Sequence, residues 1–307
     1  MRTAPSPGTV ENQSFPAGSL IISRGDNRKV ANFSTTVVQL AAAHEAKIMA
    51  FTTGFSNSGF DLGSTAYSAL PRPKVATIAG PALSNTEFGQ LWYFFEQELN
   101  YPLSIYPIED WTTALADHNT LILAEGQYPF SESQQQQLLQ WVRGGGKLIA
   151  IGEATRALAE QPGFGLTPKS GKENENQDPT TDLLLPYGEA ERRFISTYNP
   201  GAVFATELDL SHPLSFGLAS PYASLKTNNL YYDYLNNGAW NVGRVRPGGH
   251  ISGFVGKAAQ LQFAESLTFG VEEIGRGQVI YLIDNPLFRG FWQNGKLLFS
   301  NALFQVH

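Results

Sequence analysis

Residues 74–100 read KVATIAGPALSNTEFGQLWYFFEQELN, and this stretch decides the fold of the chain. Its first part, Lys74–Gly80, is a short apolar run that ends in glycine, as a buried strand does. The motif Ser84-x-x-Glu87 that follows is a capping box, which marks the start of a helix. Behind it the apolar residues recur at helical spacing: Phe88, Leu91, Trp92, Phe95 and Leu99. The stretch therefore predicts a strand followed by a helix.

The same alternation of strand and helix continues to residue 160. The expected elements are the strands Leu103–Pro107, Thr120–Ala124 and Lys147–Ile151, a helix from a second capping box at Ser131 to Arg143, and a helix over Glu153–Glu160. Short connections between such elements favour a parallel sheet with helices on both faces. We predict the α/β class, with an open, mostly parallel sheet of five or more strands.

The remaining sequence adds strands at the C-terminal end and a separate segment at the N-terminal end. The expected late elements are the strands Gly201–Glu207, Gly249–Val255, Ser266–Ile274 and Gln278–Asp284, and a helix over Arg289–Phe304. A strand at Ser19–Ser23, a helix at Val30–His44 and a strand at Lys47–Thr53 precede the main pattern. We expect a flexible lead-in at residues 1–14, an N-terminal α/β segment at 15–72 packed on the main domain, and the main domain at 73–307. Within that domain, the polar and aperiodic residues 165–182 predict a mobile loop.

Composition excludes several classes of function. The 307 residues contain no cysteine, which removes disulfides, thiolate metal sites and a cysteine nucleophile. The net charge is -6, and Arg192-Arg193 is the densest basic cluster, so we expect no nucleic-acid partner. Apolar runs stay below the 18 or so residues that a membrane span needs. The start, Met1–Gln13, lacks the apolar core of a signal peptide, so either the protein is cytoplasmic or the chain begins inside a longer precursor.

Five segments carry a resemblance to a known family. They read WYFFE at 92–96, ELNYP at 98–102, WVRGGGKLIAIG at 141–152, DLSHPL at 209–214 and DNPLFRGFW at 284–292. Residues 15–307 resemble the C-terminal region of large exported zinc carboxypeptidases of Bacteroidetes-type bacteria. That region is similar to class I glutamine amidotransferase-like domains. The resemblance implies a flavodoxin-like or amidotransferase-like fold, a periplasmic or extracellular location, and the zinc peptidase domain of a longer native chain as a partner.

The residues that either chemistry would need are missing. An amidotransferase nucleophile sits on the turn after a strand, and in the best match Ala154 stands at that position after Lys147–Ile151. Thr155, the only hydroxyl nearby, has no adjacent base. None of the five histidines begins the His-x-x-Glu pair of a zinc carboxypeptidase. We therefore predict a pseudoenzyme with no catalytic residue, no cofactor and no metal.

Polar residues beyond the carboxyl ends of the expected strands remain candidates for a ligand site, because ligands bind there in open α/β sheets. The candidates are Glu125, Glu153, His212, Asp284, Asn285 and Arg289. Each also has a structural interpretation: carboxylates at helix starts, a histidine held by a backbone carbonyl, and a capped helix start with a local ion pair.

Three functions stay open. The first is a non-catalytic accessory domain of an exported zinc carboxypeptidase-like protein, acting in domain docking, stability or substrate recruitment. Its docking contact could be the tyrosine-rich stretch Tyr231–Tyr234, unless those tyrosines pack under the long loop. The second is a hydrolase with an unconventional site near Glu153 and His212. The third is a small-ligand-binding module on a degenerate amidotransferase fold.

Overall fold

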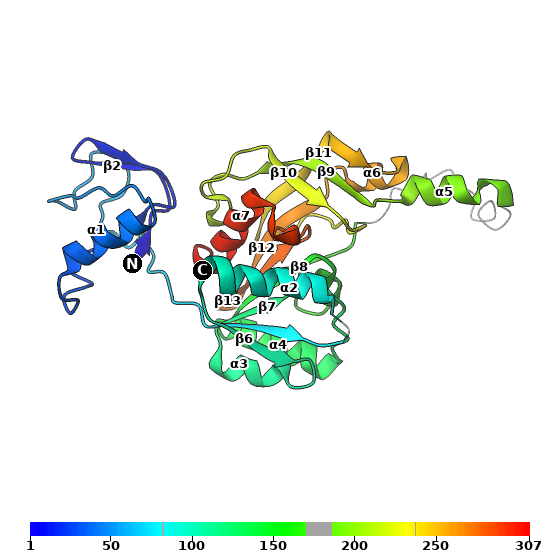
Figure 1. Ribbon diagram of the computed structural model, residues 1–307, viewed down its shortest axis with the longest axis horizontal. Coiled ribbons are helices and arrows are strands. Elements are labelled where there is room, and N and C mark those ends of the chain that lie inside the picture. Colours follow the sequence, from blue (N-terminus) through cyan, green and yellow to red (C-terminus); the bar gives the residue numbers. More distant parts are fainter. Residues whose placement is uncertain (82, 170–185, 237) are drawn as a thin grey trace. The chain divides into compact units, whose positions relative to one another are not determined.

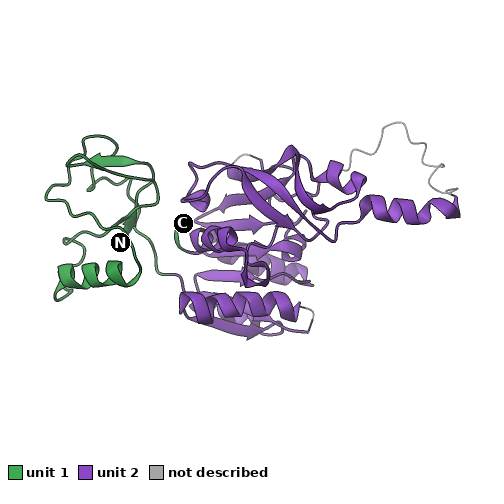
Figure 2. Ribbon diagram, turned by 45° about the horizontal axis from the view of Figure 1, so that its top comes forward, with its two compact units in different colours: residues 1–72, 304–306 green, residues 73–303, 307 purple. Residues whose placement is uncertain are grey.

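The computed structural model describes residues 1–81, 83–169, 186–236 and 238–307. The chain forms two compact units, which Figure 2 distinguishes by colour. Unit 1 comprises Met1–Arg72 with Phe304–Val306, and unit 2 comprises Pro73–Leu303 with His307. In the part of the chain that is described, no helix is long and apolar enough to cross a membrane.

Unit 1 is built from short elements around a small core. Strand β1 (Arg2–Thr3) pairs with β4 (Leu20–Ile21), and β2 (Gly8–Val10) pairs with β3 (Gln13–Phe15), all antiparallel. Helix α1 covers Phe33–Ala43 and leaves all of its side chains at least partly exposed. The core consists of Ala4, Val10, Phe15 and Tyr67.

Unit 1 differs from the sequence expectations in two places. Residues 1–14, expected as a flexible lead-in, supply β1, β2 and the start of β3, and they bury Ala4 and Val10 completely. Polar composition suggested disorder, but in such a small unit a few buried apolar side chains are enough to order the chain. Residues 47–53, expected as a strand, are irregular.

Unit 2 is organised around a nine-stranded sheet with the order β10-β9-β11-β12-β13-β8-β7-β5-β6 (Figure 1). Its strands are β5 (Val75–Ala79), β6 (Leu103–Pro107), β7 (Thr120–Leu123), β8 (Lys147–Ile151), β9 (Gly201–Leu208), β10 (Tyr222–Lys226), β11 (Ala239–Phe254), β12 (Leu267–Ile274) and β13 (Gly277–Leu282). The five neighbours β13, β8, β7, β5 and β6 run parallel to one another. This half confirms the open parallel sheet that the sequence predicts.

The other half of the sheet is antiparallel and confirms the extra strands expected in the C-terminal half. Strands β10, β9, β11 and β12 pair antiparallel in turn, and β12 joins the parallel half through β13. Strand β11 is much longer than the expected Gly249–Val255. Register shifts interrupt its pairing with β9 between Val245 and Ser252, so the two ends of β11 pair with β9 in different registers.

Helices cover both faces of the parallel half. The helices of unit 2 are α2 (Asn85–Tyr93), which continues as a π-helix (Phe94–Leu99), then α3 (Ala114–Asp117), α4 (Glu132–Arg143), α5 (Ala190–Thr197), α6 (Lys257–Phe263) and α7 (Gln293–Phe304). One core cluster joins α3 and α4 to alternate residues of the strands, for example Leu138 to Leu121 and Leu148. On the other face the π-helix meets α7, with the Phe94 and Phe299 ring centroids 5.6 Å apart. Both contacts of the capping box at Ser131 form, as expected.

Two helix boundaries differ from expectation. The expected helix Glu153–Glu160 is a 3-10 helix over Gly152–Ala157. The last helix begins at Gln293, because Arg289 has a left-handed conformation with φ 48° that interrupts a continuous helix.

The loop expected at 165–182 lies mostly outside the described residues, and its described start is bonded to the core. The Gly165 N–H donates to Glu272 Oε2 over 2.9 Å, and the Lys169 N–H donates to the Tyr231 carbonyl over 3.0 Å. Residues 165–169 are therefore tied to the core by hydrogen bonds, and the mobility expected for the loop stays a prediction.

Candidate functional site

The carboxyl ends of β5 and β7 mark the point where the order of the sheet reverses. Strand β6 lies on one side of β5, and the chain then crosses to β7 on the other side. The loops that follow β5 and β7 touch through an isolated bridge between Leu83 and Gly126. In open α/β sheets such a switch point is where ligands bind.

Asn285 stands at the centre of a polar cluster at this edge. It follows β13, and its Nδ2 donates to Glu87 Oε2 over 2.5 Å, to Gln90 Oε1 over 3.3 Å and to Glu125 Oε2 over 3.3 Å. Its Oδ1 accepts the Leu287 N–H over 2.9 Å, which fixes the amide so that its N–H₂ group faces the two carboxyl groups. We call Glu87, Gln90, Glu125 and Asn285 the Asn285 cluster.

Burial of the two carboxyl groups sets the charge of the Asn285 cluster. Burial raises the pKa of Glu125 to about 7, the negative charges of Glu87 and Glu153 add to this, and the bond from Asn285 opposes it. Burial also raises the pKa of Glu87, which the amides of Gln90 and Asn285 and the charge of Arg289 lower in part. The cluster therefore exchanges a proton near neutral pH.

Gly152 occupies the strand-to-helix turn after β8 where an amidotransferase-like fold would carry its nucleophile. Its φ of +53° is the strained conformation of such a turn, so the equivalent residue is Gly152 and not Ala154, which is fully buried. A Cβ at this position would lie 2.6 Å from Glu125 Cδ. The Glu125 carboxyl thus fills the space that a nucleophilic side chain would need.

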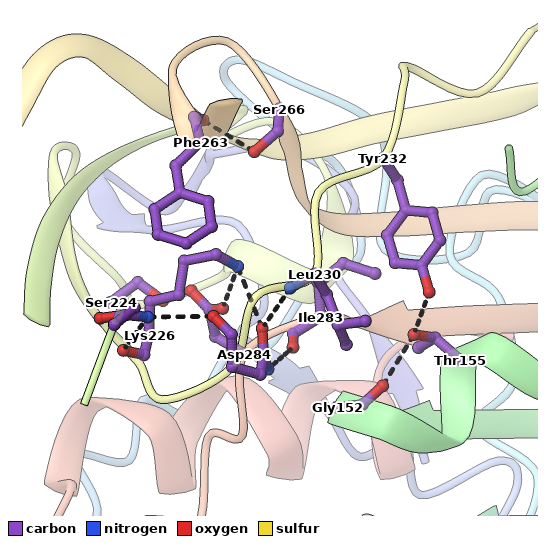
Figure 3. Close-up of polar contacts among 12 residues, drawn as sticks. Gly152, Thr155, Ser224, Lys226, Leu230, Tyr232, Phe263, Ser266, Ile283 and Asp284 are labelled. Carbon is purple, nitrogen blue, oxygen red and sulfur yellow. Dashed lines mark hydrogen bonds and ion pairs between the residues drawn. The ribbon is translucent and has the colours of Figure 1, made fainter. Parts of the chain in front are cut away.

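Thr155, the hydroxyl nearest to this turn, is committed to structural bonds. It is fully buried, its Oγ1 donates to the Gly152 carbonyl over 2.7 Å, and it shares a 3.0 Å hydrogen bond with the Tyr232 hydroxyl (Figure 3). Next to it, Glu153 is partly exposed and pairs with Arg156 over 2.5 Å. Glu153 therefore lies beside the Asn285 cluster and influences Glu125 through its charge.

Asp284 takes part in a separate buried network, although it is adjacent to Asn285 in sequence. The Asp284 carboxylate accepts from Ser224 Oγ over 2.6 Å and from Lys226 Nζ over 3.0 Å (Figure 3). The side chains of Lys226 and Asp284 are 2% and 3% exposed, so water does not reach the pair. Such a buried pair has a structural role, because removing one partner leaves an uncompensated charge.

His212 lies across the sheet from Glu153. It follows β9, whereas Glu153 follows the end of β8, and the strands β11, β12 and β13 lie between β9 and β8. Strand β9 runs antiparallel to β8, and its last residue Leu208 is level with Ile151 through the registers of the strands between them. His212 Nδ1 accepts the Leu214 N–H over 3.1 Å, and burial lowers the pKa of the ring to about 4. The two residues proposed for an unconventional hydrolase site are not brought together.

The last sequence candidate, Arg289, is exposed at the rim of the Asn285 cluster. Its guanidinium lies 5.1 Å from the centroid of the Phe288 ring, and its charge lowers the pKa of Glu87. Of the residues expected from the sequence, Glu125, Glu153, Asn285 and Arg289 lie at or beside the Asn285 cluster. Asp284 belongs to a separate buried network, and three strands separate β9, which His212 follows, from β8.

Two members of the site, Glu87 and Gln90, are not among the residues that the sequence pattern predicts. Glu87 was assigned only to the start of a helix, and Gln90 was not considered. Their spacing of three residues places them on the same side of α2, and this was the signal that could have identified them. In the tyrosine-rich stretch, Tyr232 is buried and Tyr231 packs on Phe263, whereas Tyr234 is exposed.

Within the described ranges, no group of three or more His, Cys, Asp or Glu side chains is placed to hold a metal ion. The Asn285 cluster also presents an N–H₂ group where a metal would need an oxygen ligand. Its chemistry is that of hydrogen bonding and proton exchange.

Comparisons with known proteins give one family and several distant structures. Residues 98–300 match the model of a family described as a domain of unknown function (DUF4350). No curated protein matches the chain. The fold class predicted from the sequence, an amidotransferase-like α/β sheet, is confirmed.

Three similar solved structures show the range of the likeness. A putative GMP synthase component from Thermoplasma acidophilum has 12% identity and a TM-score of 0.47, over 76% of this chain and 94% of that one. A putative ThuA-like protein from Bacteroides uniformis has 18% identity and a TM-score of 0.45, and the match covers 78% of this chain and 94% of that one. Another from Parabacteroides merdae has 14% identity and a TM-score of 0.47, over 76% and 89%. These similarities are too distant to carry an activity over to this chain.

Proposed function

We propose that this chain, which belongs to the DUF4350 family, is a non-catalytic domain that assists a separate catalytic domain. The observation that carries the proposal is Gly152 at the strand-to-helix turn. Amidotransferase-like catalysis needs a nucleophile on that turn, and glycine has no side chain to supply one.

The surroundings of the turn support the same conclusion. The Glu125 carboxyl fills the space above Gly152, so an added side chain would have to displace it. Thr155 is buried and forms two side-chain hydrogen bonds. His212 is a neutral ring, and three strands separate β9, which it follows, from β8. A nucleophile, a base and an open position for a substrate do not meet here.

The catalytic partner that we propose is a zinc carboxypeptidase-like domain. The support is the resemblance of residues 15–307 to the C-terminal region of exported zinc carboxypeptidases. On the same basis we propose a periplasmic or extracellular location. The domain would act in docking, stability or substrate recruitment, and would contribute no group to the chemistry.

Direct assays test the absence of catalysis. The purified chain is incubated with glutamine, and separately with peptides carrying free C-termini, with zinc present or with a chelator. We expect no ammonia release above a buffer control and no release of C-terminal residues. Ammonia release, or chelator-sensitive release of C-terminal residues, would contradict the proposal.

A second assay tests the assisting role. A catalytic zinc carboxypeptidase domain of the resembled family is assayed alone and with this chain added in trans. We expect the chain to lower KM for peptide substrates or to raise the Tm of the catalytic domain, with serum albumin as the protein control. An effect equal to that of albumin on both quantities would remove the peptidase partner while leaving the non-catalytic assignment in place.

A further inference from the structure

We propose that the Asn285 cluster is a binding site for a small primary amine whose ammonium group lies next to a carbonyl oxygen. This site does not depend on the identity of the catalytic partner. Its members come from three loops or helices that meet at the switch point: α2, the loop after β7, and the loop after β13.

The two carboxyl groups are the reason why the ligand should carry an ammonium group. Glu87 and Glu125 accept from the same amide nitrogen of Asn285, and burial raises the pKa of both carboxyl groups. Asn285 is neutral, so it bonds both carboxylates without balancing their charge. A ligand ammonium provides three N–H donors and one positive charge in a compact group, which matches two adjacent carboxylates.

The side chain of Gln90 is the reason why the ligand should carry a carbonyl oxygen next to its ammonium group. Its side chain is 8% exposed, and its Oε1 accepts from Asn285 Nδ2, so the amide lies in the cluster. Its Nε2 lies close enough to Glu87 to lower the pKa of that carboxyl group, but it makes no hydrogen bond of normal geometry to any described residue. A buried donor without a well-aligned acceptor is unfavourable, and a carbonyl oxygen on the ligand would satisfy it.

The position and the fixed geometry favour this class of ligand over a metal ion. The Asn285 amide is locked by its bond to the Leu287 N–H, so it presents a donor where a cation would need an oxygen. Glu87, Glu125 and Glu153 are each partly exposed, so a small molecule can reach the carboxyl groups from solvent. Arg289 stands at the rim, where it would repel a second positive charge on the ligand.

The test is a calorimetric titration of the full chain at pH 7.5 with four probes. Glycinamide carries the ammonium and the carbonyl oxygen, ethylamine only the ammonium, acetamide only the amide, and calcium chloride supplies a metal. We expect saturable binding of glycinamide, at least tenfold weaker binding of ethylamine, and no saturable binding of acetamide or calcium. Binding of glycinamide should weaken at pH 5.5, where Glu125 is protonated.

Three variants locate the site. Glu125→Gln should weaken glycinamide binding at least tenfold, and Gln90→Leu should bring glycinamide down to the affinity of ethylamine. Glu273→Gln, the same change at an exposed carboxylate near the opposite edge of the sheet, should bind as the unmodified protein does. Circular dichroism and Tm establish that each variant folds, and Glu87→Gln replaces Glu125→Gln if that variant does not.

Two kinds of result would overturn the proposal. One is the lack of saturable glycinamide binding, or binding that both cluster variants leave unchanged. The other is saturable binding of calcium, abolished by Glu125→Gln, in a protein that does not bind glycinamide. Neither result bears on the glutamine and peptide assays, so the two proposals fail separately.

Discussion

Replacing Glu125 with glutamine is expected to stabilise the protein above pH 7. The pKa of Glu125 is raised from 4.5 to about 7, so the folded protein holds a proton that the unfolded chain releases between these values. The stability of the native protein therefore falls as pH rises from 4.5 through 7 and then levels off. At about 1.4 kcal/mol per pKa unit the loss is at most about 3.5 kcal/mol, and solvent at the partly exposed carboxyl reduces it to about 2 kcal/mol.

Glutamine has the same shape as glutamic acid and can still accept from Asn285, but it never ionises. Urea denaturation of the native protein and of Glu125→Gln at pH 5, 6, 7 and 8 measures the difference in unfolding free energy at each pH. We expect the two proteins to be similar at pH 5 and the variant to be more stable by about 2 kcal/mol at pH 8. The control Glu273→Gln should show a difference that does not change with pH. If the difference for Glu125→Gln is also constant from pH 5 to 8, the carboxyl titrates normally and the electrostatic account of the Asn285 cluster is wrong.

Three further changes test other parts of unit 2 by denaturation. Gly152→Ala should lower the free energy of unfolding by about 1–3 kcal/mol, because of the φ of +53° and the contact with Glu125. Adding Glu125→Ala to that variant should restore part of the loss. If the effects of the two substitutions simply add, the contact does not exist. Asp284→Ala should lower the free energy of unfolding by about 3–5 kcal/mol, because it leaves Lys226 buried and unpaired. Adding Lys226→Met should recover at least half of this loss. An equal loss in the single and the double variant would contradict the expectation. Burial lowers the pKa of Lys147 from 10.5 to about 7, so between these values the unfolded chain binds the extra proton and stability should rise with pH. Lys147→Met should lose this rise, and an unchanged rise would assign it to another group.

Local signals in the sequence were enough to predict most of the strands and helices in the parallel half of unit 2. The strand at Lys74–Gly80 and the capping box at Ser131 depend on neighbouring residues, and both form as expected. The short elements of unit 1 were harder, because two- and three-residue strands leave almost no period in a sequence. Their order comes from contacts between residues far apart, such as Val10 and Tyr67.

The candidate site could be predicted in part. Glu125 and Asn285 follow parallel strands, whose carboxyl ends share an edge, so their meeting follows from the sequence pattern. His212 follows β9, which three strands separate from β8, and a sequence pattern does not give the order of strands in a sheet. Asp284 precedes Asn285 directly, and adjacent residues at a strand end point to different sides. The role of Gly152 depends on its φ, which composition does not reveal.

The place of β13 in the sheet has a consequence for how the chain acquires its structure during synthesis. Strand β13 lies between β12 and β8, and Gln278 pairs with Lys147, which precedes it by a long stretch of chain. The ribosome releases β8, at residues 147–151, long before its second neighbour β13, at residues 277–282. Until then β8 exposes an unpaired apolar edge, which is a hazard for association with other chains. Pairing at such long range also closes a large loop, which slows folding. We therefore expect the nascent chain to depend on late residues for protection, and chains shortened before Gly277 to aggregate.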